Sequence, residues 1–356
     1  MQFEQKIVTK LCEQAQTFFN QKENPSNVFK TSISGKRYTI VKTADGTSDQ
    51  HFLLRKRLGV GGFGQVFVGL PIDMKKFTID KTKLMAVKIT DFSERGSLSI
   101  TDREESKKEC EHEITCLKLF DSFVSFSFSK RPTENTISTG KIAIKKQVEI
   151  EECILSMTLH SGKSMDKHLN SPVYPILSLL DMSYSLADKL SLIHAQGVIH
   201  SDLNPKNVLW DDKTRAVNIV DFNRAKLLKA GEIYCFSNLR SAKDWMAPEC
   251  STVTKEELKQ YGGGYKYSKA SDIYSMGLIL AAKYGLNSAE ASYLRLDKKL
   301  IKEFIAKMTQ PDEKSRPNIE QCKEFFLGLK MQLARDYNDR AKEKLIDIVD
   351  KLSSRP

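Results

Sequence analysis

Two aspartates and an asparagine in the second half of the chain have types and spacing that could do chemistry. Asp202 and Asn207 lie in the run His-Ser-Asp-Leu-Asn-Pro-Lys-Asn at residues 200–207, and Asp221 follows a strand-like run, Val-Asn-Ile-Val. At this spacing one group can reach a substrate hydroxyl and the other a cation, and the second aspartate adds a hard oxygen ligand. Magnesium prefers such ligands together with phosphates. An ordinary Asp/Asn turn could explain each short segment alone, but the ordered set favours a magnesium and phosphate site.

A glycine-rich run, Gly-Val-Gly-Gly-Phe-Gly at residues 59–64, is the second candidate. Glycines let the backbone close over phosphates, whose oxygens then accept from exposed backbone N–H groups. A dinucleotide-binding fingerprint would require a helix directly after the glycines. The strand-like Val-Phe-Val at residues 66–68 follows instead, which disfavours that interpretation. A glycine-rich hairpin turn without a ligand is the remaining alternative.

The third candidate is Lys88, which closes the apolar run Met-Ala-Val-Lys at residues 85–88. A lysine among buried strand residues requires an anionic partner. Phosphate oxygens would serve, and a carboxylate on a helix could hold the amine in place. Glu113 is the preferred carboxylate and Glu109, one helical turn earlier, is its rival. A lysine that extends to solvent from an edge strand is the simpler alternative.

The elements that position these residues change character along the chain. Residues 3–19 have helical apolar spacing and predict an amphipathic helix that docks on the main domain rather than on a partner. Residues 37–42 and 51–58 predict the two arms of a hairpin. A helix is predicted at 101–120, and further strands at 65–69, 84–90, 122–130, 141–150 and 153–159.

After about residue 164 the chain is predominantly helical by pattern. Helical spacing of apolar residues predicts helices at 173–196, 268–283, 300–309, 319–334 and 336–352. Strands first and helices afterwards predict an α+β protein with two lobes.

In this order the motifs resemble the eukaryotic protein kinase family, whose signature includes a Gly-rich loop, a strand lysine, a catalytic loop, Asp-Phe-Gly and Ala-Pro-Glu. Ala-Pro-Glu is intact at 247–249, and the run at 271–277 matches the central helix of the family's C-lobe. The resemblance implies a bilobal kinase fold with a β-rich N-lobe and a mainly α-helical C-lobe. The implied domains are an N-terminal extension at 1–51, a kinase domain at 52–332 divided into 52–160 and 161–332, and a C-terminal helical extension at 333–356.

The resemblance also implies roles for individual residues, with ATP and Mg²⁺ as cofactors. Asp202 would accept or position the substrate hydroxyl, Lys88 would bind phosphates with Glu113 as its orienting partner, and Asn207 and Asp221 would hold magnesium. The run at 312–317 implies an ion pair between Glu249 and Arg316. Asp272 would brace the catalytic loop, and Leu117, Phe222 and His200 would form part of a hydrophobic stack. The implied nucleotide-binding residues are Leu58, Gly59, Gly61, Gly64, Val66, Ala86, Lys88, Met157, Thr158, Leu159, His160 and Leu209.

Three residues depart from the family pattern. Ser201 replaces the arginine that pairs with a phosphate in the activation loop, so we expect activity that does not depend on that phosphate. Ser237 and Ser241 are possible phosphorylation sites, with unmodified loop serines favoured. Asn204 replaces a catalytic lysine and brings a hydrogen-bond donor without charge. Asn223 replaces the glycine of Asp-Phe-Gly, where asparagine tolerates a positive φ.

Insertions relative to the family are expected at 71–83, 131–140 and 251–267, and the stretch from 285 to 300 is short where a substrate-docking helix is usual. The glycine run at 262–264 predicts a flexible loop. These differences indicate a divergent branch of the family.

We therefore expect a serine/threonine-type protein kinase that transfers the γ-phosphate of ATP to protein substrates. A pseudokinase scaffold and a small-molecule phosphotransferase are the alternatives. The net charge of +11 comes from dispersed lysines, so neither specific nucleic-acid binding nor membrane binding is expected. Seven scattered cysteines without a Cys-x-x-Cys pair suit a reducing compartment, which predicts a cytoplasmic protein, with nuclear residence left open. The pattern does not address the oligomeric state.

Overall fold

The computed structural model describes residues 2–21, 26–61, 64–92, 100–139, 142–169, 176–237, 243–251, 253–261, 264–285 and 297–353. The chain divides into two units, Met1–His160 and Ser161–Pro356. None of the helices among the described residues is both long and apolar enough to cross a membrane.

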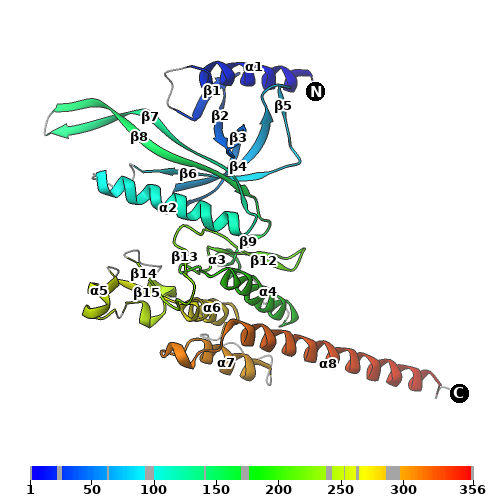
Figure 1. Ribbon diagram of the computed structural model, residues 1–356. Coiled ribbons are helices and arrows are strands. Elements are labelled where there is room, and N and C mark those ends of the chain that lie inside the picture. Colours follow the sequence, from blue (N-terminus) through cyan, green and yellow to red (C-terminus); the bar gives the residue numbers. More distant parts are fainter. Residues whose placement is uncertain are drawn as a thin grey trace. The chain divides into compact units, whose positions relative to one another are not determined.

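Unit 1 is built on an antiparallel sheet whose main path has the order β1-β2-β3-β4-β6-β8-β7, with β5 paired to β4 (Figure 1). A pairing of Ala44 with Phe126 also joins β2 to β7. Beside it, the hydroxyls of Thr43, Ser125 and Ser156 form a buried chain with spacings of 2.5 and 2.6 Å. The strands are β1 (Val28–Ile33), β2 (Lys36–Ala44), β3 (Asp49–Gly61), β4 (Gly64–Asp73), β5 (Thr78–Ile79), β6 (Met85–Asp91), β7 (Phe123–Thr139) and β8 (Ile142–Thr158).

The predicted N-terminal helix is present as α1 (Gln2–Phe19) and docks on its own unit, as expected. Its apolar face buries Leu11, Cys12 and Ala15 against a cluster that includes Phe29 and Ile40. Figure 1 shows α1 beside the β1, β2 and β5 region of the sheet. Burial of this face removes apolar surface from water, which is the main stabilising contribution that such a helix makes.

The second helix of unit 1 is α2 (Ile100–Leu119), close to the predicted range of 101–120. Ile114, Cys116 and Leu117 are buried, and the helix packs against β7 and β8. The apolar spacing of these residues therefore fixes the side of α2 that faces the sheet.

One expected break in unit 1 is wrong, and two stretches expected as insertions contribute strands. Residues 131–139, expected as part of an insertion, continue the β7–β8 hairpin, which pairs from Phe123 to Thr139. The charged residues at 151–152 do not end a strand, because buried Glu152 accepts a 3.0 Å hydrogen bond from Ser129 on the facing strand. The stretch 71–83 extends β4 to Asp73 and adds β5, so the predicted insertion forms part of the sheet.

Unit 2 is largely helical, with short strands between the helices. The hydrophobic helix α4 (Ile176–Ala195) packs against α8 (Ile319–Ser353) and α6 (Lys269–Lys283), and Ser268 caps α6 through a capping box. The other helices are α3 (Met165–Leu169), α5 (Lys255–Tyr261) and α7 (Asp297–Met308). The strand sets are β9 (Lys163–Ser164), β11 (Val208–Asp211) and β12 (Ala216–Ile219); β10 (Val198–Ile199) and β13 (Lys226–Leu227); and β14 (Cys235–Ser237) and β15 (Tyr265–Tyr267).

The predicted helices 319–334 and 336–352 form one continuous helix, α8, so the expected break near residue 335 is wrong. Residues 329–353 contain neither glycine nor proline, and nothing in the local sequence therefore stops the helix. The stretch expected as an insertion at 251–267 contains α5 and β15. Residues 262–263 of the glycine run, and 286–296 of the short stretch, lie outside the described residues.

Candidate active site

The contact expected between Lys88 and Glu113 is present in unit 1. The Lys88 Nζ lies 2.9 and 2.8 Å from the two carboxylate oxygens of Glu113, and both side chains are buried. Lys88 lies in the middle of β6, and Glu113 lies on the face of α2 that packs on the sheet. A buried charge without a partner is strongly unfavourable, so each residue stabilises the other's charged form.

The glycine-rich run joins β3 to β4, whose last pair is Gly61 with Gly64, and residues 62–63 lie outside the described ones. Gly64 has a φ of 121°, and a β-carbon there would collide with the carbonyl oxygen of Ile89 and lie 2.9 Å from the Thr90 Cα. Glycine is therefore required at this position. The strand expected after the glycines begins at Gly64, which excludes the dinucleotide fingerprint.

The other predicted nucleotide-binding residues of unit 1 lie on neighbouring strands. Val66 pairs with Lys88, and Ala86 pairs with Met157 across β6 and β8. Leu58 is 43% exposed on β3.

The predicted hydrogen-bonding segment is 158–160, at the end of β8. The amide of Thr158 already donates to the carbonyl oxygen of Ser122 at 2.9 Å. Leu159 and His160 follow the end of β8.

The loop that contains Asp202 is braced by Asp272, from the first turn of α6. The buried carboxylate of Asp272 accepts hydrogen bonds from the amides of His200 and Ser201 at 2.8 and 2.9 Å. His194 Nε2 lies 2.9 Å from the same carboxylate. The predicted bracing contact of Asp272 is thus present, and it fixes the backbone directly before Asp202.

The two asparagines of the loop support Asp202 from the other side. The Nδ2 atoms of Asn204 and Asn207 each donate to the Asp202 carbonyl oxygen at 2.9 Å. Asn204 also accepts from the Lys206 amide at 3.0 Å, so both of its side-chain polar atoms are used within the loop. This geometry favours a role for Asn204 in shaping the loop over the direct catalytic role expected from the sequence.

Asn207 and Asp221 flank the β11–β12 hairpin in the sequence. Asn207 precedes β11, and the amide of Val220 donates to its carbonyl oxygen at 2.9 Å, next to Asp221. Asn207 Nδ2 lies 3.3 Å from the Asp202 carboxylate, and within the described residues its Oδ1 has no hydrogen-bond partner. Leu209, the remaining predicted adenine contact, is half-buried on β11.

The donor set fits magnesium, because it offers an amide oxygen and a carboxylate, which are hard ligands. Among the described residues, no group of three or more His, Cys, Asp or Glu side chains could hold a metal by itself. Asn207 and Asp221 are the residues of this set that would hold the ion.

The tolerance of asparagine for a positive φ is not used at Asn223. Asp221 has a φ of 69° and Ser201 a φ of 56°, whereas Asn223 is not in the left-handed region. Asn223 is instead buried, and neither of its amide atoms has a hydrogen-bond partner among the described residues. A positive φ thus occurs at a metal-binding candidate and at the residue before Asp202, and also at Ser34, Phe77, Asp121 and Arg215 away from them.

The serine at position 201 has a local function that the sequence did not suggest. Its hydroxyl donates to the carbonyl oxygen of Arg224, and Nε2 of the neighbouring His200 contacts the carbonyl oxygen of Val220 at 3.2 Å. The rings of His200 and Phe222 also pack edge to face at 5.2 Å, as part of the predicted stack. The catalytic loop and the chain around Asp221 are therefore held together at several points within unit 2.

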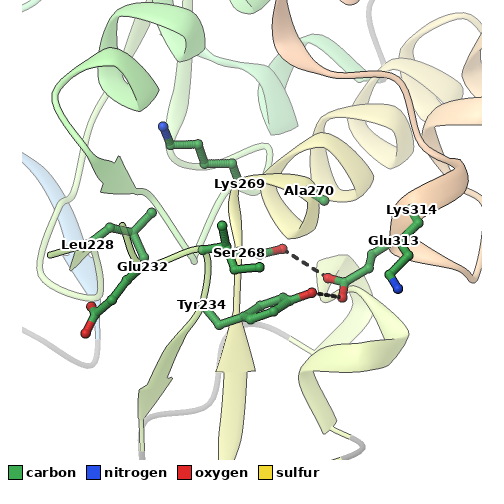
Figure 2. A pocket seen from close by; sticks show the side chains of 9 residues that line it. Leu228, Glu232, Tyr234, Ser268, Lys269, Ala270, Glu313 and Lys314 are labelled. Atoms are coloured by element: carbon green, nitrogen blue, oxygen red, sulfur yellow. Dashed lines mark hydrogen bonds between the residues drawn. The ribbon is translucent and has the colours of Figure 1, made fainter. Parts of the chain in front are cut away.

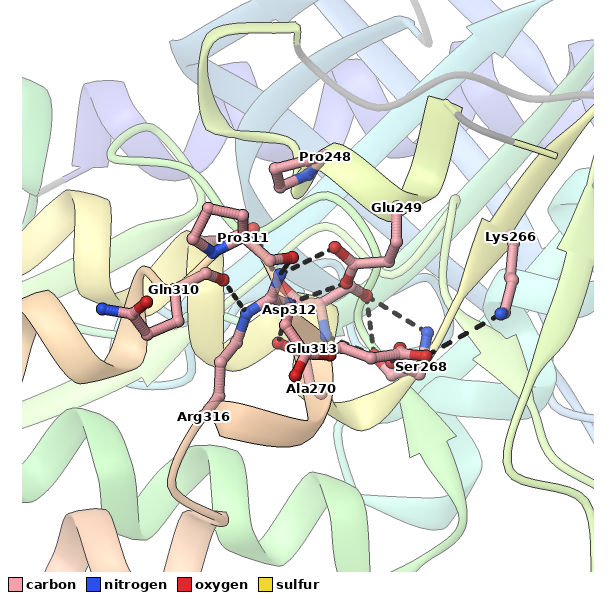
Figure 3. A network of polar contacts seen from close by, with 12 residues as sticks. Pro248, Glu249, Lys266, Ser268, Ala270, Gln310, Pro311, Asp312, Glu313 and Arg316 are labelled. Atoms are coloured by element: carbon pink, nitrogen blue, oxygen red, sulfur yellow. Dashed lines mark hydrogen bonds and ion pairs between the residues drawn. The ribbon is translucent and has the colours of Figure 1, made fainter.

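An ion pair and a pocket lie away from these residues. The ion pair expected between Glu249 and Arg316 is present, with two N–O distances of 2.7 Å (Figure 3). A pocket of about 290 Å³ is lined by Leu228, Tyr234, Ser268 and Glu313 among others (Figure 2). The pocket contains none of the predicted site residues, and no local motif marks it, because its walls come from distant parts of the sequence.

The family comparison agrees with these features. The family model for the protein kinase domain matches residues 52–286, which is more than half of the chain. The chain therefore belongs to the protein kinase family, whose domain has two lobes, and the α+β class expected from the sequence agrees with the helices and strands observed.

Individual relatives are serine/threonine kinases by name. A probable LRR receptor-like serine/threonine-protein kinase of Arabidopsis thaliana is 28% identical over 233 residues, which cover 63% of this chain and 20% of that protein. Ribosomal protein S6 kinase alpha-2 of Mus musculus is 30% identical over 34% of this chain and 15% of its own length. Ribosomal protein S6 kinase alpha-3 of Homo sapiens is 26% identical over 52% and 26%. The chain thus spans about a quarter or less of the length of these relatives.

Proposed function

We propose that the protein is an ATP- and magnesium-dependent protein kinase that phosphorylates serine or threonine hydroxyls of protein substrates. The observation that carries the proposal is the buried pair of Lys88 and Glu113. Burial of two charges costs desolvation energy that their attraction barely offsets, so such a pair is weak evidence for stability. Binding of phosphate oxygens by the lysine therefore explains this buried pair better than a contribution to stability does.

Each residue has a distinct task in this proposal. Lys88 binds the α- and β-phosphates, and the glycine-rich run covers them with backbone N–H groups. Asn207 and Asp221 hold magnesium, which supplies charge neutralisation when it is bound. Asp202 positions the substrate hydroxyl and accepts its proton. Transfer then depends on positioning and on stabilisation of charge rather than on a covalent intermediate.

The pseudokinase alternative rests on the two altered supporting residues, Ser201 and Asn204. Both are engaged in hydrogen bonds that hold the loop around Asp202, which weakens the argument that they mark a decayed site. A complete set of lysine and metal-binding candidates also supports the enzyme. The small-molecule phosphotransferase alternative has no specific observation in its favour.

The test is transfer from labelled ATP with magnesium to casein and myelin basic protein. We expect transfer by the wild type and loss of transfer in Asp202→Ala and Lys88→Met. Asp336→Ala changes an exposed aspartate on α8, and Lys36→Met changes an exposed lysine on β2, so both matched controls should retain transfer. Phosphoamino-acid analysis should find phosphoserine or phosphothreonine.

A nucleotide thermal-shift experiment separates binding from catalysis. ATP with magnesium should raise the melting temperature of the wild type and of Asp202→Ala, because a ligand that binds only the folded state stabilises it. Lys88→Met should lose this shift. A wild type that is stabilised by nucleotide but transfers nothing would make the protein a pseudokinase.

The cellular compartment that we propose for the protein is the cytoplasm, because the scattered cysteines suit a reducing environment.

A further inference from the structure

The stretch 251–267, which the family pattern does not require, supplies a strand partner for the activation segment. This segment runs from Asp221 to Glu249, and residues 238–242 within it lie outside the described ones. Its strand β14 pairs antiparallel with β15, and Cys235, at the start of β14, pairs with Tyr267, at the end of β15. Backbone hydrogen bonds therefore tie the middle of the segment to an element that follows it in sequence.

Side chains reinforce this pairing directly before β14. The Tyr234 hydroxyl donates a 2.6 Å hydrogen bond to Glu313, whose other oxygen lies 3.3 Å from the Ser268 hydroxyl (Figure 2). Lys266 of β15 has its Nζ 3.8 Å from the centroid of the Tyr234 ring and 3.8 Å from Glu313. It also lies 3.9 Å from Glu257 on α5. One ammonium group thus lies near two carboxylates and makes a cation–π contact with the Tyr234 ring.

The short turn that carries Glu313 also holds the far end of the segment. Glu313 begins the single-turn helix Glu313–Ser315, and Arg316, which caps that helix, binds Glu249 (Figure 3). Asp312 fixes the turn by accepting from the Lys314 amide and the Ser315 hydroxyl at 3.1 and 2.8 Å. The same turn therefore binds the segment before β14 and at its end.

We propose that this turn, α5 and β15 form a clamp that holds the activation segment in one conformation without a phosphate, and that Tyr234, Lys266 and Glu313 position the protein substrate because they fix this segment. The positioning role rests on the proposed kinase function. Activation segments are commonly ordered by a phosphate paired with arginine. Here Ser201 replaces that arginine and is already bonded to Arg224 at the start of the segment. The clamp supplies the ordering contacts from inside the chain.

Hydrogen exchange tests the clamp itself and needs no enzymatic activity. Tyr234→Phe removes the hydroxyl that binds Glu313, and Lys266→Met removes the charge that the two carboxylates share. We expect amide exchange in residues 234–237 to quicken about tenfold in each variant, as the loss of one hydrogen bond to a charged group would produce. Tyr284→Phe removes a 2.9 Å hydrogen bond to Ser183 elsewhere in unit 2 and should leave this exchange unchanged. Unchanged exchange in both clamp variants would overturn the proposal, and Lys266→Met decides it if Tyr234→Phe does not fold.

Kinetics then test the positioning role. The protein is treated with phosphatase, and mass spectrometry verifies that no phosphate remains on the segment. Wild-type activity should be unchanged by this treatment. The KM for casein should rise several-fold in Tyr234→Phe and Lys266→Met, and the KM for ATP should stay constant. The glutamine of Glu313→Gln can still accept a hydrogen bond from the Tyr234 hydroxyl. The KM for casein should therefore rise less in Glu313→Gln than in Tyr234→Phe.

Activity that requires a phosphate on the segment would contradict a clamp that works without one. Equal changes of the KM for ATP and for casein would contradict the positioning role. If the wild type transfers no phosphate at all, the proposed kinase function fails. The exchange experiment still decides whether the clamp exists, so the two failures are distinguishable.

Discussion

Arg316 binds Glu249 through two parallel hydrogen bonds of 2.7 Å, and its side chain is completely buried. Its N–H groups also donate to the carbonyl oxygens of Gln310, Ala270 and Pro311. The planar guanidinium suits this arrangement because it presents several donors in a fixed geometry. One side chain thus joins the end of the activation segment to the start of α6 and to the turn before α8.

Arg316→Met should lower the free energy of unfolding by about 3–5 kcal/mol, because it leaves Glu249 largely buried without its partner. Urea denaturation measures this change. Arg335→Met removes an exposed arginine on α8 and should change stability little. Equal losses of unfolding free energy in Arg316→Met and Arg335→Met would show that the buried ion pair stabilises the protein no more than an exposed arginine does.

A pair of glycines in the same run should behave differently. Gly64→Ala should destabilise the protein, because Gly64 has a positive φ and its added methyl would meet the backbone of β6. At Gly59 no atom lies within 4 Å of an added β-carbon and no positive φ is required, so Gly59→Ala should leave the melting temperature nearly unchanged. Differential scanning calorimetry compares them, and a similar loss at both positions would refute the steric argument.

Removal of the brace under the catalytic loop should loosen that loop. Asp272→Ala leaves the amides of His200 and Ser201 without their acceptor, and each hydrogen bond to a charged group contributes about 1.5–3 kcal/mol. We expect faster amide exchange at these two residues and a loss of transfer. Asp336→Ala is the matched control. Slow exchange that persists in Asp272→Ala would mean that other contacts hold the loop.

The buried thiols should make stability depend on pH in the alkaline range. Burial raises the pKa of the Cys322 thiol to about 12, above its ordinary value of 9.0. The neutral thiol is thus favoured in the folded state, so its contribution is present below pH 9 and is lost as the pH rises toward 12. Cys322→Ala should reduce the fall of unfolding free energy with pH above 9 by at most about 1.4 kcal/mol per pH unit. An unchanged slope would contradict this.

Local patterns predicted much of the structure because they reflect local causes. Apolar spacing identified α1 and α2, and the motif that resembles the family predicted the Lys88–Glu113 and Glu249–Arg316 contacts. The points at which strands and helices end were less predictable. Charged residues at 151–152 suggested the end of a strand, yet a hydrogen bond from Ser129 lets Glu152 remain in β8. A contact of this kind depends on the facing strand and cannot be read from the segment itself.

The candidate site shows the same division. Asp202, Asn207 and Asp221 were identified by their residue types and spacing, but the positive φ of Asp221 and Ser201 was not anticipated. The cluster of Tyr234, Lys266 and Glu313 was missed entirely. Its members are far apart in sequence, and only the pairing of β14 with β15 brings two of them together.

The apolar cluster beneath α1 means that the borders of a sequence family and of a folding unit need not agree. The family match starts at residue 52, yet Leu53 and Ile72 inside it pack in one cluster with Leu11, Ala15 and Ile40 before it. A fragment cut at the match would expose the partners of those three side chains to water and leave β3 without β2. For anyone who expresses this chain, α1, β1 and β2 are part of the fold rather than an appendage to trim.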